Sequence, residues 1–272
     1  MTGDSLRNLH QREADFSDDW AADTPIEAIL VHECFEAPTA QENRFILNRM
    51  GPLAGKRLLD IGAGLGESSV YFALQGAKVT FLDISPGMVD TALRLGRLHG
   101  VEMVGIVSPV EEFSFPDRGF DFVYIANTIH HVVDRERLFS SMHRALKPGG
   151  RFFSWDPVKY NPAINVYRRM ATGNRTEDET PLGLEDLKLA RRHFANVQHR
   201  EYWIAALALF IKYYLFDRVH PNDDRYWKRI LKETDRTLRW WKPFRAADAL
   251  LTRIPGIRWL AWNMVMWGDK AP

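Results

Sequence analysis

The apolar positions along residues 41–203 follow two alternating patterns. Short, nearly continuous apolar runs predict strands, and they lie at residues 56–64, 77–85, 104–109, 120–127, 150–157 and 196–203. Apolar residues at helical spacing predict helices at residues 67–76, 86–100, 134–147 and 182–194, after two helical pieces at 24–50 that break near Pro38. This alternation favours an α/β fold with a doubly wound, mostly parallel sheet.

The pattern changes after Trp203. Three successive helices are predicted at residues 204–219, 223–241 and 244–254, and the apolar, aromatic-rich stretch 256–270 is predicted to be a last strand. We therefore expect the chain to be organised in four parts: N-terminal helices that cover the ligand site at residues 1–50, an α/β core at 51–203, a helical insertion at 204–256, and the final strand of the core sheet at 257–272.

Composition narrows the classes of protein. The chain has 272 residues, a net charge of +1 and one cysteine, Cys34. The balanced charge gives no overall attraction to nucleic acid, and a lone cysteine excludes an intramolecular disulfide and fits a reducing compartment. The N-terminal stretch lacks the apolar region of a secretory signal, and the apolar run at 202–210 is too short to cross a bilayer. We expect a cytoplasmic protein.

Three glycines follow the first predicted strand, in the stretch LLDIGAGLGESS at residues 58–69. A loop for a nucleoside triphosphate is excluded, because Glu67 rather than a lysine follows the last glycine and its carboxylate would repel phosphate. The dinucleotide fingerprint G-x-G-x-x-G is one residue longer than the G-x-G-x-G found here, which disfavours a nicotinamide-dependent oxidoreductase.

Two acids beside this turn indicate the kind of ligand. Asp60 precedes the first glycine and suits a cationic ligand that carries an amino group and a sulfonium, as S-adenosylmethionine does. Asp83 ends the second predicted strand and can accept hydrogen bonds from both hydroxyls of a ribose. Dinucleotide folds use an acid in the same way, so Asp83 alone does not separate the two ligands.

Three segments, in this order, resemble signature segments of the class I S-adenosylmethionine-dependent methyltransferases. They are LLDIGAGLGESSVYFALQGAKVTFLDISPGMVDTA (58–92), EEFSFPDRGFDFVYIANTIHHV (111–132) and RALKPGGRFFSWDP (144–157). The resemblance covers about residues 41–158. It implies S-adenosylmethionine as the cofactor and a seven-stranded sheet whose last strand is antiparallel to the others.

The resemblance also assigns residues to the cofactor. The methionine moiety would be held by Asp60, Gly62, Ala63, Gly64 and Gly66, the ribose by Asp83, and the adenine by Ile84, Met88, Val110 and Glu111, while Ala126 and Asn127 would face the methionine tail and the transferred methyl group. The family has an acid near the adenine amino group where this chain has Pro109. Glu111 is then the nearest carboxylate.

Methyl transfer needs an acceptor atom held in line with the sulfonium, and a base where a proton must leave. His130 and His131 follow the fourth predicted strand and Asp156 ends the fifth, so these three are the catalytic candidates, although His131 and Asp156 could instead stabilise their turns. Asn161 and Arg168, further along the chain, could line the acceptor pocket. No cluster with metal-ligand spacing is evident, so no metal is expected.

The insertion carries an unusual composition. Between Arg200 and Arg258 basic residues outnumber acidic ones thirteen to seven, with aromatic residues interleaved. This composition fits peripheral contact with an anionic membrane, a large hydrophobic acceptor, a cap packed on the sheet or a homodimer contact. No motif of a nucleic-acid reader is present.

We therefore expect methyl transfer by direct displacement to a small, hydrophobic or lipid-like acceptor. The acceptor atom (oxygen, nitrogen or carbon) stays open. The alternatives are a non-catalytic S-adenosylmethionine-binding sensor or scaffold and, less favoured, a nicotinamide-dependent oxidoreductase.

Overall fold

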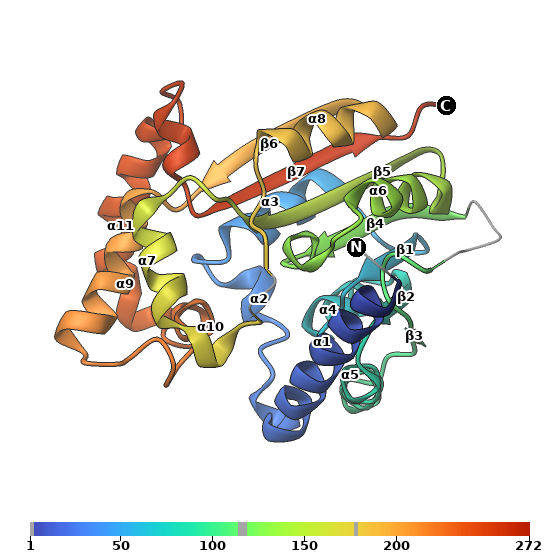
Figure 1. The fold of residues 1–272 in the computed structure, drawn as a ribbon, viewed down its shortest axis with the longest axis horizontal. Helices are drawn as coiled ribbons and strands as arrows, with labels where there is room; N and C mark the ends of the chain where they lie inside the picture. The colour runs from blue at the N-terminus through green and yellow to red at the C-terminus, as the bar shows by residue number, and fades with distance from the viewer. Residues whose placement is uncertain (1–2, 114–118, 177–178) are drawn as a thin grey trace.

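A seven-stranded sheet forms the centre of the computed structural model, which describes residues 3–113, 119–176 and 179–272 (Figure 1). The strand order is β3-β2-β1-β4-β5-β7-β6. The strands are β1 Arg57–Ile61, β2 Lys78–Asp83, β3 Val104–Val107, β4 Phe120–Ala126, β5 Leu146–Pro157, β6 Ala195–Tyr202 and β7 Asn263–Asp269. β7 is antiparallel to its neighbours β5 and β6, and the other neighbouring pairs are parallel. The predicted fold class is confirmed. Residues 114–118 of the second signature segment lie outside the described residues.

Helices cover both faces of the sheet, because successive strand residues point to opposite sides. In β1, Leu58 packs into an apolar cluster with α3 (Gln41–Met50) and α4 (Glu67–Leu74). Leu59 packs into a second cluster with α6 (Arg135–Ala145) and α8 (Leu184–His193). The α-helices are α1 Gly3–Asp23, α2 Glu33–Glu36, α3 Gln41–Met50, α4 Glu67–Leu74, α5 Pro86–Leu98, α6 Arg135–Ala145, α7 Pro162–Met170, α8 Leu184–His193, α9 Ala208–Ile211, α10 Tyr226–Lys232 and α11 Thr234–Leu251. None of these described helices meets the length and apolarity needed to cross a bilayer.

Two predicted boundaries around the fifth strand are wrong. The helix predicted to run to residue 147 ends at Ala145, because Leu146 already pairs with Phe120 of β4 and begins β5. No helix was predicted between residues 157 and 182, but the structure has α7 there. Its N-cap is Asn161, whose side-chain oxygen accepts the backbone N–H groups of Ala163 and Ile164. This cap fixes the start of α7.

The insertion is also divided differently from the prediction. Its first helix is broken into a 3-10 turn at Ala205–Leu207, α9 and a π-helical turn at Lys212–Phe216. α11 runs through Pro243, where a break was expected. A proline inside a helix costs about 3 kcal/mol, but Trp241 before it and Asp248 after it are both buried, which holds the two halves in line. β7 begins only at Asn263, after a 3-10 turn.

N-terminal helices were expected within residues 1–50, but the sequence pattern gave no bounds for α1 at residues 3–23. α1 packs along α5, with the Asp18 carboxylate accepting the backbone N–H of Gly87 at 2.8 Å and the hydroxyl of Ser85 (Figure 1). Leu9, Phe16 and Trp20 recur at helical spacing within an otherwise polar stretch. Those three positions were the available signal.

Candidate active site

The glycine turn after β1 packs closely against the segment that follows β4, at Thr128. Gly62 has a φ of +68°, and a Cβ placed on it would lie 2.4 Å from the Thr128 hydroxyl oxygen, so only glycine fits there. Gly64, with a φ of +56°, has open space where a Cβ would lie. Its backbone can therefore be approached closely by a ligand.

Asp83 joins the turn to the end of β2. Its carboxylate is buried and accepts the backbone N–H of Gly64 at 2.8 Å and that of Ser85 at 3.0 Å. Burial raises the pKa of Asp83, although these backbone hydrogen bonds act in the opposite direction. The fold thus brings the glycine turn and this acid into direct contact.

Two cavities meet at the glycine turn. The first, of about 250 Å³, contains ten of the predicted site residues: Gly62, Gly64, Asp83, Ile84, Met88, Val110, Glu111, Asn127, His130 and His131. The second, of about 190 Å³, contains Asp60, Ala63 and Ala126 and again Gly62, Gly64 and Asn127. Six residues line both cavities and are called the shared wall: Trp20, Gly62, Gly64, Asn127, Trp227 and Trp262.

Two of the predicted cofactor-binding and catalytic residues line neither cavity. Gly66 instead meets α5, because a Cβ on it would lie 2.6 Å from the Cβ of Ala92, so its place is set by helix packing. Asp156 is fully buried behind His130. Direct contact between Asp156 and an acceptor, as the sequence suggested, is therefore not supported.

Asp60 lies in the second cavity at the end of β1. The hydroxyl of Ser69 donates to its carboxylate at 2.6 Å. Burial raises the pKa of Asp60 to about 7; the Ser69 hydrogen bond opposes this rise and the nearby charges of Asp83 and Glu67 add to it. A cationic group in the second cavity would relieve this cost.

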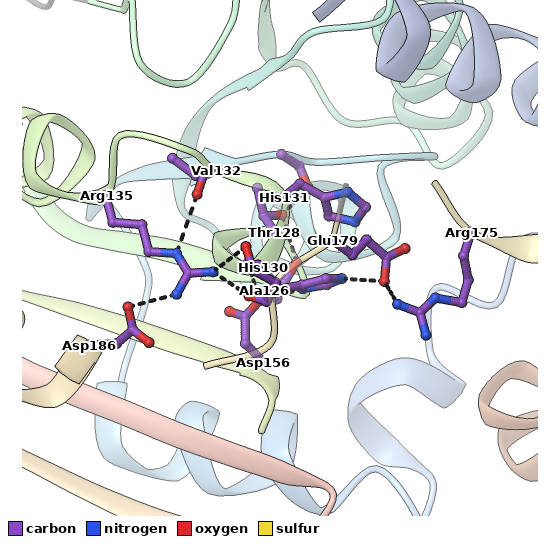
Figure 2. A network of polar contacts seen from close by, with 12 residues as sticks. Ala126, Thr128, His130, His131, Val132, Arg135, Asp156, Arg175, Glu179 and Asp186 are labelled. Carbon is purple, nitrogen blue, oxygen red and sulfur yellow. Dashed lines mark hydrogen bonds and ion pairs between the residues drawn. The ribbon is translucent and has the colours of Figure 1, made fainter. Parts of the chain in front are cut away.

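The candidate catalytic groups form one network, which Figure 2 shows from close by. His130 Nδ1 lies 2.8 Å from Asp156 Oδ1, and the same oxygen accepts the backbone N–H of His130 at 3.2 Å. On the other side of the ring, His130 Nε2 lies 3.7 Å from Glu179 Oε2, and Glu179 is paired with Arg175. His131 Nδ1 lies 3.2 Å from a Glu13 oxygen of α1.

Burial sets the protonation of these groups. It holds the pKa of His130 well below 6.5, together with the positive charges of His131 and Arg168, and it raises the pKa of Asp156 to about 8. The His130–Asp156 pair therefore retains one shared proton until near pH 8. For His131, burial lowers the pKa, but the hydrogen bond and charge of Glu13 outweigh it and raise the pKa overall.

Within the described residues, one group of donors has the spacing of a metal site. Ligand atoms of His130, His131 and Glu179 lie within 4.8 Å of one another, which sequence spacing did not reveal. Each already has a charged neighbour: Asp156, Glu13 and Arg175 respectively. A metal would have to displace the Arg175 ion pair, so the expectation of no metal stays a prediction.

Several lining residues of the first cavity were not singled out from the sequence. α1 contributes His10, Glu13, Phe16 and Trp20, and the second half of the chain contributes Tyr167, Arg175, Glu179, Arg225, Trp227 and Trp262. Of the two residues considered for the acceptor pocket, Arg168 lines the first cavity and Asn161 does not. Asn161 caps α7 and donates to the carbonyl of Leu260.

Adenine contacts were predicted near Val110 and Glu111, and both residues line the first cavity. The Glu111 carboxylate is buried, lies 3.3 Å from His10 Nε2 and accepts the backbone N–H of Val133 at 3.4 Å. Its neighbours on α1 and after β4 hold it in place. Glu111, two residues after Pro109, thus lies in the first cavity, and its contact with the adenine stays a prediction.

Comparison with known proteins follows this geometry. Residues 59–154 match the family model of the methyltransferase domain. The chain is 38% identical over 135 residues to a ubiquinone/menaquinone biosynthesis C-methyltransferase of Psychromonas ingrahamii, covering 46% of this chain and 52% of that protein. It is 36% identical over 115 residues to phosphoethanolamine N-methyltransferase 2 of Caenorhabditis elegans, covering 40% of this chain and 26% of that protein. The matches thus span about half or less of these relatives.

A solved structure extends the comparison to the fold. Phosphoethanolamine N-methyltransferase 2 of Haemonchus contortus, in complex with phosphomonomethylethanolamine and S-adenosylhomocysteine, aligns with a TM-score of 0.56 and 23% identity, over 85% of this chain and 52% of that chain. At this identity the likeness concerns the fold. Residues 59–154 thus match the methyltransferase-domain family, and the whole fold is similar to that of a solved S-adenosylhomocysteine-bound methyltransferase.

Proposed function

We propose that this protein transfers the methyl group of S-adenosylmethionine to a small acceptor by direct displacement. The observation that carries the proposal is the junction of the two cavities at the shared wall, with His130 facing the first cavity. A ligand that lies along the shared wall would reach Asp60 in the second cavity at one end and His130 in the first cavity at the other. The methyltransferase-domain match over the same strands supports this assignment.

The residues around the wall fit S-adenosylmethionine. Asp83 keeps free lone pairs beyond its two backbone hydrogen bonds, and these can accept ribose hydroxyls. Asp60 offers a buried carboxylate to the α-ammonium group, which would offset the cost of its ionisation. Ile84 and Met88 give the adenine an apolar surface in the first cavity.

When bound, S-adenosylmethionine supplies an electrophilic methyl group on a sulfonium. The protein's part is to hold the acceptor in line and to exclude water, which the aromatic residues of the shared wall favour. His130 can take a proton from the acceptor at Nε2, because Asp156 holds the ring through Nδ1. Asp156 is a positioning residue in this scheme.

The first cavity also bears on the choice between an enzyme and a sensor. A closed space beside the candidate base would leave no place for an acceptor, whereas the cavity here has room beside His130. Aromatic residues from three segments, Phe16, Tyr167 and Trp262, line it. This composition supports an acceptor with substantial apolar surface.

Calorimetric titration with S-adenosylhomocysteine, with NAD as the control, tests the proposal. We expect micromolar binding of S-adenosylhomocysteine and none of NAD. Release of S-adenosylhomocysteine on addition of an acceptor would then separate an enzyme from a sensor. Binding of NAD alone, or of neither compound, would contradict the proposed function.

A further inference from the structure

α7 places Arg168 in the lining of the first cavity, next to His130. Ile164, Tyr167, Arg168 and Ala171 line the first cavity, at the spacing of one helix face and the residue just after it. The adjacent Arg169 is exposed and lies outside the cavity lining. Two neighbouring arginines of the same helix therefore face different surroundings.

The acids of this region already have partners. Glu179 is paired with Arg175, Glu13 lies 3.2 Å from His131 Nδ1, and Asp156 binds His130. The nearby Asp186 is paired with Arg135 at 2.8 Å. Each negative charge around the network is thus matched by a neighbouring positive or proton-bearing group.

Arg168 has no such partner among the described residues: it makes no hydrogen bond or ion pair there, although it feels the charges of Arg175, Glu179 and Asp156. Burial and the positive charge of Arg175 lower the pKa of Arg168 to about 10. Its guanidinium stays charged at neutral pH and offers up to five N–H donors. A partly buried cation of this kind is stabilised by an anion bound in the cavity.

The surroundings of Arg168 add a second positive charge and an apolar wall. The guanidinium of Arg225, which lines the same cavity, lies 3.5 Å from the centroid of the Trp20 ring. Phe16 and Tyr167 lie on the same lining. The cavity therefore offers cationic groups together with aromatic surface.

Resting on the proposed function, we propose that the acceptor carries a carboxylate or a phosphate monoester, which the guanidinium of Arg168 binds beside the His130–Asp156 pair. The apolar body of the acceptor contacts Phe16, Tyr167 and Trp262. Arginine is suited to this role because its planar donors match the oxygens of both anions. The acceptor is thus an amphiphilic anion and not a purely hydrophobic molecule.

The test compares two glutamine variants, Arg168→Gln and its exposed neighbour Arg169→Gln. Inorganic phosphate and benzoate are titrated into protein saturated with S-adenosylhomocysteine, at constant ionic strength, with tryptophan fluorescence as the readout because Trp20, Trp227 and Trp262 line the cavity. We expect one of the two probes to bind wild type and Arg169→Gln equally. Arg168→Gln should weaken that binding by about tenfold or more.

The two probes distinguish the source of the anion: binding of benzoate supports a carboxylate, and binding of phosphate supports a phosphate monoester. Binding of neither probe to the loaded wild-type protein would overturn the proposal and leave the proposed function intact. Equal losses in both variants would also overturn it, since they indicate general charge attraction. If Arg168→Gln does not fold, Arg168→Lys takes its place, because it keeps the charge but not the planar donors. We expect it to bind the anion several-fold more weakly than wild type does.

A separate titration of S-adenosylhomocysteine tests whether Arg168 binds the cofactor instead of the acceptor. We expect its affinity to be the same in wild type and Arg168→Gln. A tenfold loss would mean that Arg168 binds the carboxylate of the cofactor, which would overturn the acceptor assignment. Absence of S-adenosylhomocysteine binding in wild type would instead refute the proposed function.

Discussion

Replacing Asp60 by asparagine should stabilise the ligand-free protein and weaken cofactor binding at the same time. The asparagine keeps the shape of the side chain, and its oxygen can still accept the Ser69 hydroxyl that lies 2.6 Å away in the wild type. What the change removes is a carboxylate that is almost completely buried at the end of β1.

The magnitude follows from the pKa of Asp60. Burial raises it from 3.8 to about 7. The pKa of Asp60 is therefore higher in the folded protein than in the unfolded chain, so ionisation of Asp60 lowers the free energy of unfolding. This cost is absent below pH 4, grows as the pH rises and is complete above pH 7. A shift of roughly three units at about 1.4 kcal/mol each gives a cost of about 4 kcal/mol at pH 8.

Urea unfolding of both proteins at pH 5 and pH 8 measures this cost. We expect Asp60→Asn to exceed wild type in free energy of unfolding at pH 8, with the advantage shrinking by about 2–3 kcal/mol at pH 5. The exposed Asp90 on α5 provides a control, and Asp90→Asn should change neither value. Equal effects of Asp60→Asn at both pH values would refute the reasoning.

The same variant tests the assignment of Asp60 to the cofactor. Loss of a charged acceptor for the α-ammonium group should weaken S-adenosylhomocysteine binding by about tenfold or more in calorimetry. If Asp60→Asn is more stable than wild type but binds the cofactor more weakly, the wild-type protein loses stability by keeping the carboxylate that binds the cofactor. Unchanged affinity would remove Asp60 from the cofactor site.

Three further outcomes are expected. Asp83→Ala should weaken S-adenosylhomocysteine binding by about tenfold or more, measured by calorimetry, because a bidentate charged contact is lost; unchanged affinity would exclude Asp83 from the site. His130→Gln should lower turnover of an acceptor that loses a proton by about 100-fold or more while cofactor affinity stays the same. In wild type that turnover should rise with pH and level off above about pH 8, as the His130–Asp156 pair loses its shared proton, and a flat profile would contradict the role of the pair. Treatment with a chelator should leave turnover unchanged, because Arg175 and Glu13 already neutralise the groups that could bind a metal; loss of activity restored by a divalent cation would show that a metal is required.

The cofactor side of the molecule was predictable because its chemistry lies at strand ends. The glycine turn and Asp83 each follow a strand that the apolar pattern marks, and parallel strands bring their carboxyl ends to one edge. Their contact, the Gly64 N–H to the Asp83 carboxylate, depends only on β1 and β2 being neighbours. The class of fold and the place of the ligand site followed from the same pattern.

The acceptor side was much less predictable. His130 and Asp156 were both identified as candidates. Their contact depends on how far β5 extends before it ends, and the end of β5 lies where the Asp156 side chain is buried and cannot contact a ligand. The placement of Arg168 on a cavity wall depends on α7, which Asn161 caps and which the sequence analysis did not identify as a helix. The bounds of α1 were not predicted, because its apolar stripe is narrow and most of its residues are polar.

β6 and β7 pair directly with each other, and their last paired residues are Tyr202 and Asn263. In the topology of the sheet, everything between these two residues is the loop of a single hairpin. The entropy of closing a loop grows only slowly with its length, so such a loop can lengthen, shorten or be replaced at little cost to the sheet. The glycine turn and Asp83 belong to β1 and β2, on the other side of β4 and β5. The hairpin loop supplies Arg225, Trp227 and Trp262 to the first cavity, so a changed loop would alter that part of the pocket while Asp60 and Asp83 stay where β1 and β2 hold them.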